Sequence, residues 1–175
     1  TRYDSQGARI WFDIYDGPAA GQDTARALVV DGSGNVIVTG ASELTTGNYD
    51  YVVIKYTPAG ARSWVARYDS PLHTGDFPAD IGADTLGNVF VTGYSQAGNG
   101  NDFTTLKYGP DGSLLWTARY NGPLGAASDD RPYALAVDAG GGIRVGGTSS
   151  TTDGMQRIRG DIWDYASVRC DSLGN

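Results

Sequence analysis

Aspartates recur at fixed positions along the chain, and carboxylates in this pattern first suggest cation binding. Asp31, Asp84 and Asp138 each open a segment rich in glycine or asparagine, as in Asp31-Gly-Ser-Gly-Asn35. A calcium site needs about six to eight oxygen ligands, usually from several acidic residues of one loop. Each segment offers one aspartate and at most one asparagine, so we predict Asx turns, in which the aspartate accepts hydrogen bonds from the backbone ahead of it.

A second set of aspartates, Asp23, Asp76 and Asp130, precedes the first set by eight residues each time. The connections on the same face of a propeller also contain Asp50, Asp102 and Asp164. A ring of these carboxylates near the central axis is a candidate cation site, above all at Asp23, Asp76 and Asp130, with calcium as the one cofactor considered. The alternative is that each one holds backbone N–H groups where a strand begins. Repetition in register argues against catalysis, because a reaction centre needs different groups in different roles.

Residues outside the repeated pattern are the better candidates for specific recognition. An insertion at 151–160 contains Arg157 and Arg159, and Trp163 follows it. Two guanidinium groups beside an indole are suited to a carboxylate, a sugar or a protein partner. The alternative interpretation is a tolerated loop insertion without a ligand.

Three tryptophans define the unit that positions all these residues. Trp11, Trp64 and Trp116 recur at intervals of 53 and 52 residues, a period typical of repeated supersecondary units. We expect a single domain over 1–175 with repeats at about 12–64, 65–116 and 117–175, and with an outer strand at 8–15 completing one unit. The fixed phase of the tryptophans predicts packing between units rather than a carbohydrate platform.

Each unit resolves into four short strands, which predicts an all-β fold. In the first unit we expect strands at 27–30, 36–42, 51–56 and 62–68, joined by glycine-containing turns. No stretch shows a sustained apolar period of about 3.6 residues, so no helix is expected. Four antiparallel strands repeated in tandem are the construction of a β-propeller blade. The sequence therefore predicts three four-stranded blades.

Composition limits the possible partners. The chain has 175 residues, 26 glycines and a net charge of −7. Nucleic acid and anionic membranes both favour basic surfaces, so neither is an expected partner. No apolar run approaches the roughly 18 residues needed to span a bilayer, and membrane insertion is not expected.

A single cysteine, Cys170, excludes an intrachain disulfide framework, and we expect an inert, partly buried thiol.

The repeated residues resemble a known family. The pattern W-x-x-x-Y…D…D-x-x-G-N-x-x-V-T-G…D…K-Y…G is similar to the bacterial SBBP-type β-propeller repeat over almost the whole chain. The third unit departs from it: Gly142 and Gly146 replace the asparagine and threonine, Cys170 replaces the tyrosine, and roughly eight extra residues precede Asp164. The resemblance implies a secreted or surface-displayed bacterial protein and supplies no catalytic residues.

Three blades are too few for a closed ring, since propellers typically have about four to eight. The chain opens at Thr1 without an initiator methionine or a signal peptide, so we expect a mature, processed or excised segment. Either two copies join into a six-bladed ring with exchanged strands, or the chain is a segment of a longer array. The expected partners are accordingly a second copy or the remaining blades.

The leading functional hypothesis is a non-enzymatic scaffold or binding module, located outside the cell or at its surface. One alternative is a lectin-like propeller that binds carbohydrate or peptide through Arg157, Arg159 and Trp163. Another is a hydrolase or lyase with a carboxylate-lined central pocket, which would need unlike carboxylates with separated pKa values.

Overall fold

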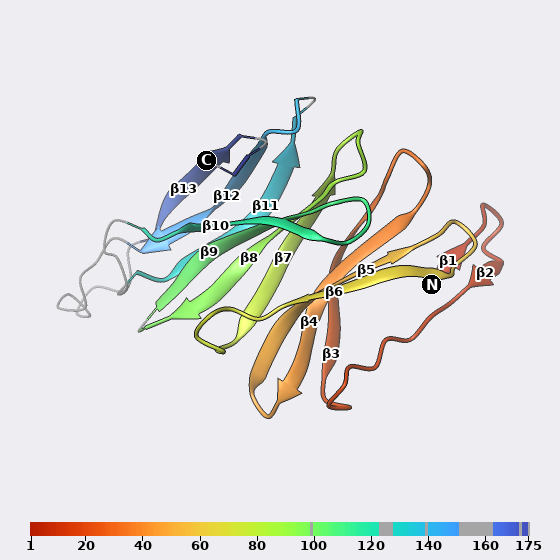
Figure 1. Ribbon diagram of the computed structural model, residues 1–175, viewed down its shortest axis with the longest axis horizontal. Helices are drawn as coiled ribbons and strands as arrows, with labels where there is room; N and C mark the ends of the chain where they lie inside the picture. The colour runs from red at the N-terminus through yellow and green to blue at the C-terminus, as the bar shows by residue number, and fades with distance from the viewer. Residues whose placement is uncertain (99, 123–127, 139, 151–162, 172, 175) are drawn as a thin grey trace.

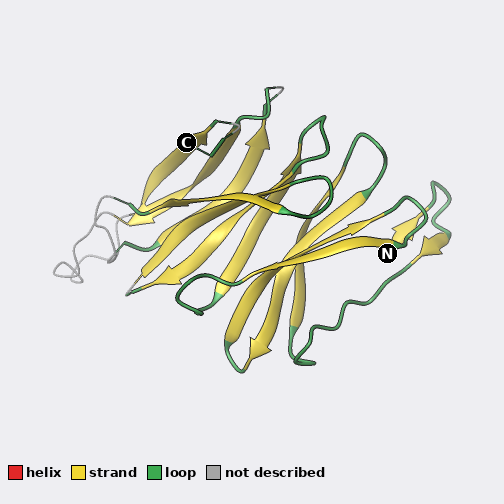
Figure 2. Cartoon of the chain, in the orientation of Figure 1, coloured by secondary structure: helices red, strands yellow, loops and turns green. Residues whose placement is uncertain are grey.

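Antiparallel strands and tight turns make up the described part of the chain, and no helix occurs there (Figure 2). The structure is a computed structural model that describes residues 1–98, 100–122, 128–138, 140–150, 163–171 and 173–174, with only the backbone of 163–166. Within these residues there is accordingly no helix that could cross a membrane. The all-β prediction is confirmed.

The strands follow one another along the chain with short connections. Their bounds are β1 Arg2–Tyr3, β2 Arg9–Trp11, β3 Asp23–Val30, β4 Val36–Thr45, β5 Asn48–Tyr56, β6 Arg62–Tyr68, β7 Asp76–Ala83, β8 Val89–Ala97, β9 Gly100–Tyr108, β10 Leu114–Tyr120, β11 Asp130–Val137, β12 Ile143–Ser150 and β13 Trp163–Cys170.

Consecutive strands pair into separate sheets that succeed one another across the molecule (Figure 1). We call them the N-terminal hairpin (β1–β2), the first sheet (β3–β6), the second sheet (β7–β10) and the third sheet (β11–β13). In the described residues they have 2, 4, 4 and 3 strands, which corrects the expected three four-stranded units. Within the expected outer strand at 8–15, residues Arg9–Trp11 form a strand, which pairs with Arg2–Tyr3 across a tight turn.

Asx turns join the first two strands of each sheet, as predicted. Asp31 Oδ1 accepts hydrogen bonds from the backbone nitrogens of Ser33 and Asn35 at 3.0 and 2.9 Å. Asp84 and Asp138 accept the equivalent bonds in the second and third sheets. These carboxylates are occupied by their own turns, and the turns fix the register of the strand pairs that they connect.

The sheets pack face to face through apolar side chains. Between the first and second sheets the buried residues are Ile37, Tyr51, Val53 and Tyr68 on one side and Ile81, Val89, Val91, Leu106 and Tyr108 on the other. Between the second and third sheets they are Phe90, Phe103, Ile143, Val145 and Cys170. Cys170 stands where the earlier units have a tyrosine, and burial raises the pKa of its thiol. The thiol is buried more completely than expected, and a raised pKa leaves less of the thiolate, which is the reactive form.

Each tryptophan packs on the turn of the following unit. The Trp64 ring lies over Gly112, where a Cβ atom would be 2.8 Å from Trp64 Cδ2, and Trp64 Nε1 donates to the Pro110 carbonyl at 2.9 Å. Trp11 lies over Gly60 in the same way, and Trp116 over Gly174. The predicted role in packing between units is confirmed.

We expect Trp64→Ala to lower the free energy of unfolding by about 3–5 kcal/mol, because it removes a large ring from an interface between sheets. Trp64→Phe keeps an aromatic ring over Gly112 and loses the bond to Pro110, so it should cost less. Urea unfolding followed by far-UV circular dichroism measures both. A loss below about 1 kcal/mol for Trp64→Ala would show that the contact does not hold the sheets together.

Candidate functional site

Three equivalent aspartates stand at the beginning of the first strand of each sheet. Asp23, Asp76 and Asp130, which we call the strand-start aspartates, accept hydrogen bonds from the backbone nitrogens of Gly17, Ser70 and Gly122 at 2.9, 2.8 and 2.7 Å. Each bond fixes the connection that leads from one sheet to the next. Of the two roles considered for these residues, holding backbone N–H groups is the one that the contacts show.

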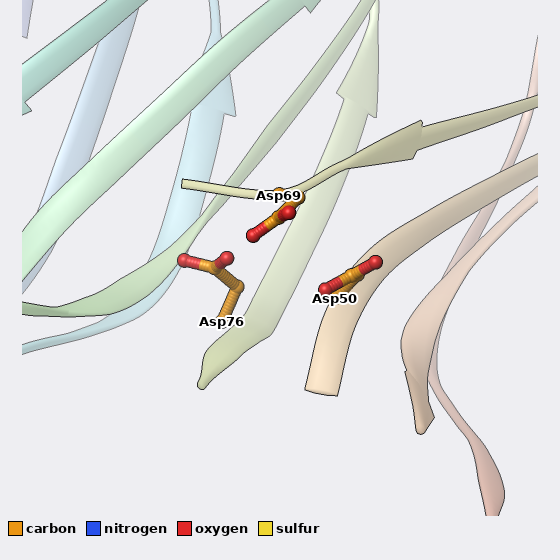
Figure 3. A group of neighbouring side chains, drawn as sticks. All are labelled: Asp50, Asp69 and Asp76. Atoms are coloured by element: carbon orange, nitrogen blue, oxygen red, sulfur yellow. The ribbon is translucent and has the colours of Figure 1, made fainter. Parts of the chain in front are cut away.

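The strand-start aspartates are not gathered into one cluster. Among the described residues, the acidic group whose ligand oxygens lie within 4.8 Å of one another consists of Asp50, Asp69 and Asp76 (Figure 3). We call it the carboxylate cluster. It contains Asp76 of the strand-start aspartates and Asp50, which was expected on the same face. The cation site predicted at Asp23, Asp76 and Asp130 stays a prediction.

The carboxylate cluster lies where the first sheet meets the second. Asp50 belongs to β5, Asp69 follows β6 directly, and Asp76 begins β7. Sequence reasoning missed Asp69, although a signal exists: the residue after the repeat tyrosine is Asp16, Asp69 or Asn121 in the successive units. The cluster therefore combines residues of two adjacent repeats.

Two of the three carboxylates are buried. Asp50 is 2% exposed and Asp76 is 0% exposed, and burial raises the pKa of both side chains. Arg67 Nη2 lies 3.1 Å from Asp50 Oδ2, and the exposed His73 ring contacts Asp69 Oδ2 through Nδ1 at 2.5 Å. Hydrogen bonding to Asp69 raises the pKa of His73. The site thus places three acidic groups against one guanidinium and one imidazole.

The next interface has a different composition at the equivalent positions. Between the second and third sheets the corresponding residues are Asp102, Asn121 and Asp130. Asp130 accepts hydrogen bonds on both oxygens, from Gly122 N and Ser128 Oγ on Oδ2 and from Ser149 Oγ on Oδ1. An amide therefore replaces the third carboxylate there, and the strand-start aspartate is fully bonded.

A groove of about 650 Å³ lies between the N-terminal hairpin and the first sheet. Apolar side chains line much of it, among them Leu28, Val30, Val36 and Val38, which we call the open face. Beside these residues Ile54 and Tyr56 are buried under Trp11 and Tyr15.

The recognition cluster proposed for the third unit lies mostly outside the described residues. Arg157 and Arg159 fall in the segment 151–162, and of Trp163 only the backbone is described, as the first residue of β13. Binding of a glycan or protein at these residues stays a prediction.

Antiparallel sheets that pack face to face through one recurring interface define an all-β repeat protein. Residues 72–103, which comprise β7, β8 and the beginning of β9, match the family model described as SBBP, Beta-propeller repeat. The resemblance found in the sequence is thereby confirmed, and the chain carries an SBBP-type β-propeller repeat. No curated protein matches the chain.

We expect Asp130→Ala to destabilise the protein by about 2–3 kcal/mol, because the buried Gly122 N–H loses its acceptor. Urea unfolding in the presence and absence of a chelator measures the loss. A structural role predicts the same loss in both conditions. A loss that disappears when the chelator is present would instead support the cation role considered for the strand-start aspartates.

Proposed function

We propose that this chain is a non-enzymatic β-propeller module in which the three sheets are consecutive blades. Its function is to form part of a larger ring by receiving a further blade of the same repeat type on the open face. The proposal is supported by one observation: the open face repeats the surface through which the second sheet packs on the first.

The repeat period makes this equivalence explicit. Shifted by one unit, residues of the first sheet that line the groove coincide with buried residues of the second sheet. The pairs are Leu28 and Ile81, Val36 and Val89, Val38 and Val91, Ile54 and Leu106, and Tyr56 and Tyr108.

Burial differs sharply between the two equivalent surfaces. Leu28 is 63% exposed, whereas Ile81 is 6% exposed beneath the first sheet. Contiguous exposed apolar surface of this kind marks interaction sites, and its burial stabilises by about 25 cal/mol per Å². The N-terminal hairpin already places Trp11 and Tyr15 where Trp64 and Tyr68 stand in the next interface. A preceding blade would also contribute its remaining strands. Among the described residues, no strand takes their place at this face.

The partner that fits best is a blade with a large apolar residue at the position of Ile37. The second sheet has Phe90 there, but the third sheet has Arg144, whose guanidinium lies 3.6 Å from Asp138. A second copy that used its third sheet would therefore place a charged side chain against Val36 and Val38. For this reason we commit to a further repeat rather than to the third sheet of a second copy.

The carboxylate cluster does not favour the hydrolase or lyase alternative. General acid–base catalysis by two carboxylates needs pKa values pushed in opposite directions. Burial raises the pKa of both Asp50 and Asp76. A scaffold or binding role, with the extracellular location expected from the family resemblance, is the function that we propose.

We expect the chain to bind 1-anilinonaphthalene-8-sulfonate (ANS) at the open face and Leu28→Asp to reduce the resulting fluorescence. Leu86→Asp is the matched control, because Leu86 is 78% exposed in the turn between β7 and β8 and lies outside the groove. A chain in which a second copy of residues 12–64 replaces residues 1–11 should lose most of this fluorescence and melt at a higher temperature.

Unchanged dye binding and melting in the extended chain would overturn the proposal. Light scattering coupled to gel filtration tests whether a second copy of the chain, rather than a further repeat, covers the open face. A dimer of the original chain that dissociates on Leu28→Asp, but not on Leu86→Asp, would replace the further repeat by a second copy.

A further inference from the structure

We propose that Asp50, Asp69 and Asp76 bind a divalent cation of the calcium type between the first and second sheets. This site is separate from the open face and does not depend on the proposed scaffold function. It also differs from the central ring of carboxylates considered from the sequence, because it lies at one interface between sheets and includes Asp69.

The spacing of the ligand oxygens fits one cation. The three carboxylates supply oxygens that lie within 4.8 Å of one another, and they face a common space from β5, from the end of β6 and from β7 (Figure 3). Calcium binds oxygen ligands at about 2.3–2.6 Å, so the ligands of one ion can lie up to about 5 Å apart. Carboxylates together with water are a donor set that hard divalent cations accept.

The hydrogen bonds leave one oxygen of each carboxylate available. The Oδ2 atoms of Asp50, Asp69 and Asp76 bind Arg67, His73 and the Ser70 backbone nitrogen. The three Oδ1 atoms are buried and have no hydrogen-bond partner in the described structure. Burying charged oxygen without a partner is costly, particularly for Asp50 and Asp76, which are almost completely buried. A cation bound among the three carboxylates would offset this cost.

The charges around the cluster leave an excess of negative charge. Arg67 pairs with Asp50 and His73 with Asp69, whereas Asp76 has no ion pair with a cationic side chain in the described residues. Arg67 and His73 contact Oδ2 atoms of the cluster, and the His73 side chain is 76% exposed. Repulsion among the carboxylates is therefore only partly offset by the protein.

The next interface serves as an internal comparison. There Asn121 replaces Asp69, and Asp130 uses both oxygens in hydrogen bonds. An amide carries no charge, so among the described residues the set of three carboxylates occurs at the first interface and not at the second. Because its ligands come from both sheets, a bound cation would link adjacent blades.

The test uses the full chain, freed of metal with a chelator and titrated with CaCl₂ by calorimetry. We expect saturable binding and a higher melting temperature with calcium. Asp69→Asn, which introduces the residue present at Asn121, should weaken calcium binding at least about tenfold, since it removes one charged ligand. Asp16→Asn is the matched control: it makes the same charge change at the equivalent exposed position of the preceding unit and should bind calcium like the original chain.

Melting in chelator gives a second measurement. Without calcium, Asp69→Asn should be at least as stable as the original chain, because it relieves repulsion among the carboxylates. The order should reverse when calcium is added. Absence of saturable binding, or equal weakening by Asp69→Asn and Asp16→Asn, would overturn the proposal. Leu28→Asp should leave calcium binding unchanged, so this result and that for the open face are independent.

Discussion

The contact between each tryptophan and the turn of the following unit is the interaction on which the stacking of sheets depends. The turn needs glycine for two reasons: Gly60, Gly112 and Gly174 have φ of about 90°, and an indole occupies the space of the missing Cβ atom. The indole N–H of Trp64 then bonds the same turn. Distance and orientation between adjacent sheets are thus set by a contact that every unit repeats.

Stacking in this manner has an electrostatic consequence at the edge where one sheet leads into the next. The connection must turn tightly, and the strand-start aspartates hold its backbone nitrogens. The same geometry brings Asp50 of the first sheet against Asp69 and Asp76. Negative charge therefore concentrates between the sheets as a result of how they are joined, and one substitution, Asn121 for aspartate, relieves it at the next interface.

The features predictable from sequence are those set by local chemistry. Asx turns at Asp31 and its equivalents follow from hydrogen bonds within a few residues, and the strand Arg62–Tyr68 has the bounds expected for it. The carboxylate cluster was not predicted, because it joins residues of two units whose distance depends on the packing between sheets. By contrast, the pairing of Arg9–Trp11 with Arg2–Tyr3 is local, because a tight turn joins the two segments.

Departures from the repeat carry more functional information than the repeat itself. Residues that every unit shares are explained by turns, registers and apolar faces, and those needs are the same at each interface. Two differences between units are not required for a blade to fold. Asp69 stands where the next unit has Asn121, and Arg144 stands where the earlier units have Ile37 and Phe90. Both differences lie at faces between sheets, one inside the molecule and one on the outward side of the third sheet. The interfaces between blades are therefore where this chain distinguishes one neighbour from another.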